Sequence, residues 1–285
     1  MADTDRTVDS KIVTVSVFEQ ALKIPKASSV LLQGSPTTCT KTLWLFPDGS
    51  GLATSYLPLP DIDATNVAVY GLSSPFVKKA EAMSDCRFEE LTASYLNEIR
   101  RRQPHGPYFV GGWSAGGISA YDAAQSLVSQ GEVVEKLILL DCPNPIGLGK
   151  LPSRLYDEFN RRNLFGMADR KPPAWLLPHM VGFLDILDTY VPRPWSGKPL
   201  KTTILWAKHG VNEDGLIQIR PEDPPNMRWL LRERKQTDLG PNGWDRLVGR
   251  ENLSIEVIEG AHHFNMLNEP SAGRLSFFIR KALGY

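Results

Sequence analysis

The sequence predicts an α/β fold in which a mostly parallel sheet is covered by helices and carries a helical lid insertion. Three observations support this prediction. Short β-branched or aromatic runs recur along the chain, amphipathic segments alternate with some of them, and one long apolar stretch has no strand pattern. Strands that alternate with helices form parallel sheets covered on both faces, and 285 residues suit one such domain with an insertion.

Seven short apolar runs are expected to form buried strands. They lie at residues 29–33, 42–46, 66–70, 107–111, 136–140, 202–206 and 253–258. Three segments have apolar residues at helical spacing, as Leu91, Tyr95 and Ile99 show for the first. These segments are 88–102, 115–128 and 272–283. In a parallel sheet of this kind, ligands bind at the carboxyl ends of the strands.

Three stretches depart from this alternation. Residues from about 143 to 199 are rich in proline and bulky apolar side chains, so we expect either a lid over an apolar substrate chamber or additional core packing. Residues 221–249 are irregular and are expected to loop over the surface before the last strand. Residues 1–26 are weakly patterned and are expected to be a linker, an N-terminal extension or an edge strand, which leaves 27–285 as a single domain.

Composition narrows the class of protein. Lys plus Arg and Asp plus Glu number 32 each, without a block of like charge, so neither a nucleic acid nor an anionic membrane is an expected partner. The three cysteines, Cys39, Cys86 and Cys142, have no metal-ligand spacing and suit a reducing compartment. The first residues lack a signal-peptide pattern, so we expect a cytoplasmic protein without a metal site.

The most specific motif is Gly112-Trp113-Ser114-Ala115-Gly116, which lies between the strand 107–111 and the helix 115–128. A serine at a sharp turn from strand to helix presents its hydroxyl above the sheet as a nucleophile. The helix N-terminus that follows supplies unpaired amides, so the Ala115 N–H is expected to bind an oxyanion.

A serine nucleophile needs a base and an acid that orients the base. His262 and His263 follow the last strand, and the residues alone do not separate them. For the acid, Asp141 stands at the end of the strand 136–140, whereas Asp214 lies in a polar loop. A carboxylate at a strand end is held more rigidly, so we expect Asp141 to be the acid and Asp214 to be a solvated carboxylate.

A second oxyanion donor is expected in the glycine-rich turn after the strand 42–46, which reads Pro47-Asp48-Gly49-Ser50-Gly51. The sequence does not separate the amides of Asp48 and Gly49. We take Gly49 as the working assignment.

Four groups of residues together resemble the terminal thioesterase domain, of Claisen-cyclase type, of fungal non-reducing polyketide synthases, which belongs to the α/β-hydrolase superfamily. They are FPDGSG at 46–51, YGLSSPF at 70–76, GGWSAGG at 111–117, and PIGL with LPSRLY at 145–148 and 151–156. The resemblance runs from about residue 29 to the C-terminus. It supports Asp141 as the acid, and the family's His-Phe-x-Met motif, matched by His263-Phe264-Asn265-Met266, favours His263 as the base.

The resemblance implies a polyketide substrate carried as a thioester on the phosphopantetheine arm of an acyl carrier protein, with no cofactor in the domain itself. Ser114 would take the chain as an oxyester. Release would follow by Claisen or Dieckmann cyclisation, by lactone or pyrone formation, or by hydrolysis. The alternative is a free-standing esterase or acyl-thioester hydrolase. Such domains usually follow a carrier protein, whereas this chain begins at Met1, so an excised domain and a free-standing enzyme both stay open.

Overall fold

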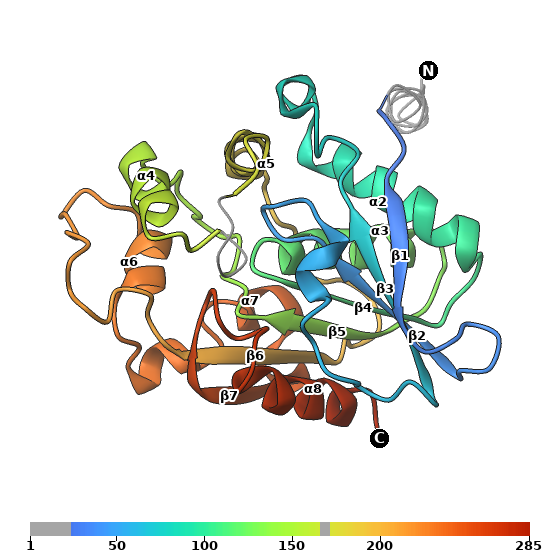
Figure 1. Cartoon of the computed structure of the whole chain (residues 1–285). Helices are drawn as coiled ribbons and strands as arrows, with labels where there is room; N and C mark the ends of the chain where they lie inside the picture. Colours follow the sequence, from blue (N-terminus) through green and yellow to red (C-terminus); the bar gives the residue numbers. More distant parts are fainter. Residues whose placement is uncertain (1–23, 166–171) are drawn as a thin grey trace, which may run out of the picture.

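The computed structural model describes residues 24–165 and 172–285, and these residues contain one seven-stranded sheet (Figure 1). Its strands are β1 (Ser28–Gln33), β2 (Lys41–Phe46), β3 (Val67–Ser73), β4 (Tyr108–Trp113), β5 (Val134–Leu140), β6 (Thr202–His209) and β7 (Leu253–His262). Their order across the sheet is β1-β3-β2-β4-β5-β6-β7, and only β1 runs antiparallel to its neighbour. The predicted mostly parallel sheet and all seven predicted strands are confirmed.

The three predicted helices are also present, as α2 (Phe88–Arg102), α3 (Gly116–Ser129) and α8 (Ser271–Ala282). The other α-helices are α4 (Ser153–Arg161), α5 (Leu176–Asp188), α6 (Pro225–Leu231) and α7 (Asp245–Val248). Short 3-10 turns complete the described elements: η1 (Ala53–Tyr56), η2 (Ala80–Met83), η3 (Gln236–Leu239) and η4 (Arg250–Asn252).

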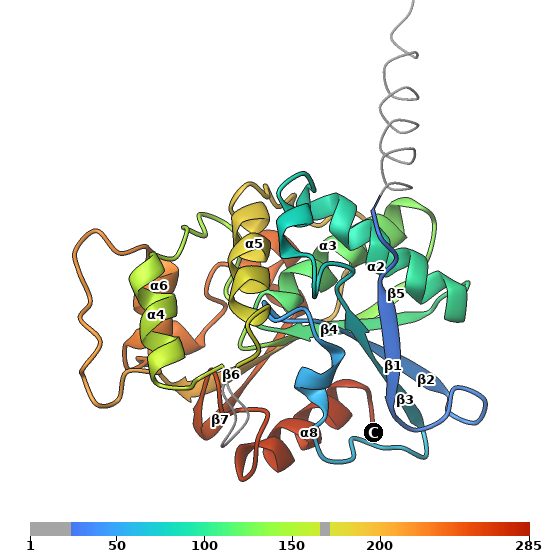
Figure 2. The same ribbon diagram turned by 45° about the horizontal axis from the view of Figure 1, so that its top comes forward.

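The sheet is covered on both faces, with α2 and α3 on one side and α8 on the other (Figures 1 and 2). Strand β2 shows why its sequence is apolar throughout. Trp44 and Phe46 pack into the core on the side of α2 and α3, whereas Leu43 and Leu45 pack into the core on the side of α8. Side chains alternate between the faces of a strand, so a strand buried on both faces needs an uninterrupted apolar run.

The predicted helical insertion consists of α4 and α5, which lie beyond the carboxyl end of β5 (Figure 2). Helix α4 packs its apolar side, Leu155 and Phe159, into a small core that also holds Met227 and Leu231 of α6. Residues 166–171 of the insertion, and 1–23 of the predicted N-terminal linker, lie outside the described residues.

The expectation that residues 221–249 loop over the surface is wrong. Helix α6 and its neighbours are packed into the molecule, because Met227 and Trp244 are fully buried and Leu231 belongs to the small core beneath α4. Arg234, which follows α6, is 4% exposed although three charged neighbours, Arg232, Glu233 and Lys235, are exposed. The stretch therefore forms one wall of the region above the sheet.

Candidate active site

Ser114 stands in a strained turn between β4 and α3, as the motif predicted. Its φ is 57°, in the left-handed region that non-glycine residues rarely adopt. The glycines on either side are required by space: a Cβ on Gly112 would lie 2.3 Å from the carbonyl carbon of Gly116, and one on Gly116 would lie 2.5 Å from the Phe46 carbonyl oxygen. Close packing of β4, α3 and β2 thus holds the Ser114 hydroxyl at the edge of the sheet.

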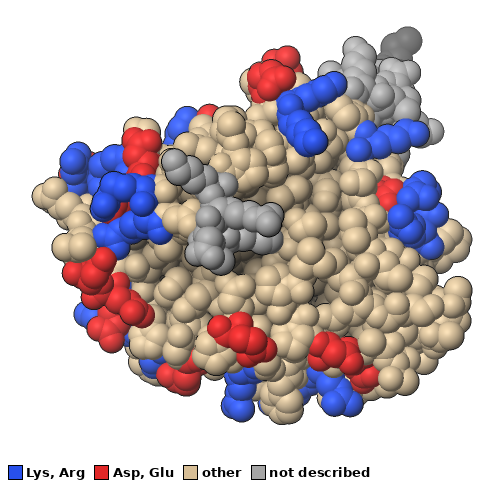
Figure 3. Space-filling model, in the orientation of Figure 1, with Lys and Arg blue, Asp and Glu red and all other residues tan. Residues whose placement is uncertain are grey.

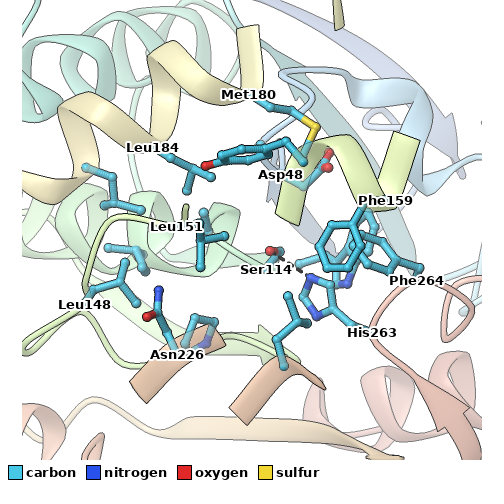
Figure 4. A pocket seen from close by; sticks show the side chains of 18 of the residues that line it. Asp48, Ser114, Leu148, Leu151, Phe159, Met180, Leu184, Asn226, His263 and Phe264 are labelled. Atoms are coloured by element: carbon cyan, nitrogen blue, oxygen red, sulfur yellow. Dashed lines mark hydrogen bonds between the residues drawn. The ribbon is translucent and has the colours of Figure 1, made fainter. Parts of the chain in front are cut away.

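A chain of hydrogen bonds runs from Ser114 to His263 and on to Asp141 (Figure 4 shows the first of them). The Ser114 Oγ lies 3.0 Å from Nε2 of His263, and Nδ1 of the same ring lies 2.7 Å from Oδ2 of Asp141. A carboxylate only accepts, so Nδ1 carries the hydrogen and Nε2 is free to take the proton of the serine hydroxyl. The structure thus brings together the three residues that we expected to be the nucleophile, the base and the acid.

Asp141 is fixed at the end of β5 by its surroundings. Its side chain is 0% exposed, and its Oδ1 accepts a hydrogen bond of 2.9 Å from the amide of Ala207. Burial raises the pKa of the Asp141 carboxyl, but the charge of Arg234 and the hydrogen bonds from His263 and Arg234 outweigh burial and lower the pKa to about 2. The carboxylate is therefore ionised throughout the neutral range.

The amides expected to bind an oxyanion lie beside Ser114. Ala115 and Gly49 both line the same cavity as the serine, and within the described residues neither backbone N–H donates to a protein acceptor. The Gly49 loop is held from above by His179 of α5, whose Nδ1 donates to the Gly49 carbonyl at 2.9 Å and whose Nε2 accepts from the Ser74 hydroxyl at 2.9 Å. Free amides on the wall of the cavity that holds the nucleophile can stabilise a tetrahedral oxyanion. Among the described residues the Asp48 amide also donates to no protein acceptor, so it stays the alternative to Gly49.

The Ser114 hydroxyl faces a cavity with an empty volume of about 750 Å³, part of it open to solvent (Figure 4). The walls are mainly apolar and come from the insertion, from α6 and from the loop after β7; they include Leu148, Leu151, Tyr156, Phe159, Phe165, Met180, Leu184, Leu187, Trp229 and Phe264. Other apolar residues of the insertion, such as Leu155 and Phe183, are buried in the packing instead. The insertion therefore both lines the cavity and adds to the core packing.

Charged residues are scattered around this site. On the face shown in Figure 3, Lys and Arg alternate with Asp and Glu near the rim, and the centre is largely uncharged. Within 24–165 and 172–285 no group of His, Cys, Asp and Glu is arranged to hold a metal ion, and no helix is long and apolar enough to cross a membrane. The surface and the cavity together suit an acyl group that is large and mainly apolar.

Comparison with known proteins agrees with this geometry. Residues 41–161 match the family model of the thioesterase domain. The chain is 56% identical over 281 residues to the non-reducing polyketide synthase ustP of Ustilaginoidea virens and 54% identical over 280 residues to the conidial yellow pigment biosynthesis polyketide synthase of Emericella nidulans. These matches cover 98% and 91% of the chain but only 13% of each synthase.

The chain belongs to the thioesterase domains of fungal non-reducing polyketide synthases.

Its fold is shared with the NocB thioesterase domain, solved as a covalent complex with a fluorophosphonate nocardicin G analogue. That structure superposes with a TM-score of 0.66 at 23% identity and covers 91% of this chain and 100% of its own.

The alternative base, His262, and the alternative acid, Asp214, lie in other surroundings in this thioesterase domain. The Nδ1 of His262 accepts a hydrogen bond of 3.2 Å from the Phe264 amide. Asp214 lies in an exposed loop and forms an ion pair of 2.6 Å with Arg162. Neither residue contacts the hydrogen-bond chain of Ser114.

Two residues contact the hydrogen-bonded Ser114, His263 and Asp141 or the loop that carries Gly49, and these contacts were not expected from the sequence. His179 lies within the predicted lid, residues 143–199, and Arg234 lies within residues 221–249, which were expected to form a surface loop. Their partners are far away along the chain, since His179 binds Gly49 and Arg234 binds Asp141. The apolar run Trp229-Leu230-Leu231 just before Arg234 was the one local sign that this stretch turns inward.

Proposed function

We propose that this thioesterase domain releases a polyketide from the phosphopantetheine arm of an acyl carrier protein through an acyl-Ser114 intermediate. The observation that carries the proposal is the continuous hydrogen-bond chain from Ser114 through His263 to Asp141 on the wall of a large apolar cavity. In this proposal Ser114 is the nucleophile, His263 the base and Asp141 the acid that orients the base. The amides of Ala115 and Gly49 bind the oxyanion.

Acylation proceeds by attack of Oγ on the thioester carbonyl while Nε2 of His263 takes the hydroxyl proton. The tetrahedral oxyanion lies against the two amides, and collapse breaks the C–S bond. The phosphopantetheine thiolate leaves with the proton returned by His263, so the products are an acyl ester of Ser114 and a free thiol. Hydroxyl, imidazole and amides supply this chemistry, so the domain needs no cofactor or metal of its own.

Release uses His263 a second time. The base removes a proton from a carbon between two carbonyls of the chain, from a hydroxyl of the chain, or from water, and the new nucleophile attacks the ester carbonyl. The C–O bond to Ser114 then breaks, and His263 returns the proton to the departing Oγ. The aromatic side chains that line the cavity support the two internal routes, because apolar walls around Ser114 limit the access of water to an ester at that position. Claisen or Dieckmann cyclisation and lactonisation are therefore favoured over hydrolysis in the proposal.

The partner and compartment follow from the same proposal. The related synthases are much longer than this chain, which matches 13% of their length. In the proposal, a carrier protein domain is the source of the thioester. All three cysteines are free thiols, which supports a cytoplasmic setting.

The deciding experiment gives an N-acetylcysteamine or carrier-bound polyketide thioester to the wild type and to Ser114→Ala and identifies the products by mass spectrometry. We expect the wild type to release thiol and a cyclised product and to accumulate an acylated protein of matching mass, and the alanine variant to do neither. Product formation by the alanine variant at the wild-type rate would exclude the covalent route.

The rival function, an esterase or acyl-thioester hydrolase, is distinguished in the same assay. Such an enzyme would turn over short nitrophenyl esters rapidly and would convert the polyketide thioester to the free acid alone. We expect slow turnover of the short esters, because they fill little of the apolar cavity and realise little of its binding energy.

A further inference from the structure

We infer that Arg234 is a positioning residue that holds the Asp141 carboxylate and restrains the basicity of His263. The geometry is a buried fork: Nη2 of Arg234 donates to Oδ2 of Asp141 at 2.9 Å, and Nη1 donates to Oδ1. Nη1 also donates to the Ala207 carbonyl at 2.7 Å. The two side chains are 1% and 0% exposed, so water does not screen this pair.

The arginine is itself held in place. Its Cζ lies 3.9 Å from the centre of the Trp229 ring, and that ring packs against the His263 ring in a T-shaped arrangement with a centroid distance of 6.3 Å. The guanidinium thus lies between an aromatic wall of the cavity and the carboxylate. A planar, bidentate contact fixes both the position and the plane of a carboxylate, which a single donor does not do.

The electrostatic consequence concerns the charge that forms during catalysis. An isolated Asp–His pair becomes neutral when the imidazole takes a proton, which favours protonation. With Arg234 present, the same step creates a net positive charge in a buried space, because the carboxylate is already neutralised by the guanidinium. Arg234 therefore makes His263 a weaker base than an Asp–His pair alone would be.

Other charges near His263 are few or shielded. His262 is next to it in the chain, and Glu213 and His209 act on His262. Asp48 lines the cavity with its carboxylate bound by the hydroxyls of Ser50 and Ser55. The charged neighbours of Arg234 in the chain, Arg232, Glu233 and Lys235, are exposed to water. Arg234 is the buried cation that lies against the carboxylate.

A restrained base has a chemical use that rests on the proposed function. Water is a very weak acid, whereas a carbon between two carbonyls gives up its proton much more readily. Weakening the base therefore slows attack by water on the acyl-Ser114 ester more than it slows attack by an internal carbon nucleophile. Arg234 would extend the life of the ester against hydrolysis and leave time for cyclisation.

The test measures the pH dependence of kcat/KM in Arg234→Met and the wild type with a simple nitrophenyl ester, and then the ratio of cyclised to hydrolysed product with the polyketide thioester. We expect the acid limb of the methionine variant to move to higher pH by about one unit or more, and the hydrolysed fraction to rise severalfold. The matched control is Arg154→Met, which removes an arginine from another buried carboxylate, Asp223, and should leave the acid limb in place.

The pH dependence tests the role of Arg234, and the polyketide products test the proposed substrate. An unchanged acid limb in folded Arg234→Met overturns the inference, whatever the polyketide assay shows. A shifted limb without any polyketide product upholds the role of Arg234 and removes the proposed substrate instead. If Arg234→Met does not fold, Arg234→Lys replaces it: the ammonium keeps the charge and loses the fork, so the acid limb should stay while kcat falls about tenfold. An unchanged kcat in the lysine variant overturns the inference.

Discussion

Gly51→Ala should displace the loop of residues 47–51, which carries Gly49, through a single added methyl group. Gly51 has a φ of 75°, and a Cβ there would lie 2.3 Å from Cε1 and 2.5 Å from Nε2 of His179, with the Ser74 Cβ at 2.9 Å. None of these atoms belongs to the free end of a flexible chain, since the imidazole is hydrogen-bonded on both nitrogens. The methyl group and the imidazole cannot both stay in place.

The expected cost has two parts. A left-handed backbone costs about 1 kcal/mol for alanine, and overpacking at a well-filled site costs about 1–3 kcal/mol. The free energy of unfolding should therefore fall by about 2–4 kcal/mol. Displacement of His179 also releases the Gly49 carbonyl. In the proposed mechanism this displaces the Gly49 amide, and loss of one oxyanion donor lowers kcat by about 100-fold to 1000-fold.

The assay combines urea unfolding with kcat for a nitrophenyl ester, and Gly131→Ala is the control. Gly131 also has a positive φ, 84°, but a Cβ there meets nothing within 4 Å, so its substitution carries the backbone cost without the clash. The difference between the two variants isolates the contact with His179. Equal losses of stability in both variants, with kcat unchanged in Gly51→Ala, would refute the reasoning.

Three further changes have defined outcomes. Gly112→Ala places a methyl group 2.3 Å from the backbone of Gly116 and should lower the free energy of unfolding by more than about 3 kcal/mol in urea melts. His263→Ala should lower kcat at least about a thousandfold, whereas His262→Ala should stay active, both measured with a nitrophenyl ester. Burial raises the pKa of Asp122 to about 6, so the folded state takes up a proton and the wild type loses stability as pH rises from about 4 to 6. Asp122→Asn should therefore be more stable than the wild type by up to about 3 kcal/mol near pH 7.5, with little difference near pH 4.

Each of these has an opposite result that counts against it. A Gly112→Ala protein of unchanged stability would show that β4 and α3 can separate without cost. Full activity in His263→Ala with loss in His262→Ala would reverse the assignment of the base. A constant difference between Asp122→Asn and the wild type across the pH range would show that the pKa of Asp122 is the same in the folded and unfolded states.

The sheet and the nucleophile turn could be predicted because their signals are local. An apolar run such as Leu43 to Phe46 needs burial on both faces wherever it lies, and the glycines around Ser114 are required by atoms within a few residues or in the next strand. The acid at a strand end, Asp141, is local in the same sense. Short stretches of sequence are therefore sufficient to predict these features.

Arg234 and His179 could not be predicted because their roles depend on distant partners. Arg234 lies among exposed charged residues, and nothing in that stretch shows that it alone turns inward to Asp141. The contact of His179 with the Gly49 carbonyl joins residues 130 positions apart. A single sequence does not show how a helical insertion is positioned against the loops of the sheet. Such contacts can therefore be identified only from the three-dimensional structure.

The imidazole of His179 connects two parts of the molecule, helix α5 and the loop that carries Gly49. It is a buried residue of the helix that roofs the cavity, and it is the support of the loop that carries Gly49. A roof that moved away from the sheet would take this support with it. In the proposed mechanism, the cover over the cavity and the position of the Gly49 amide therefore depend on the same side chain.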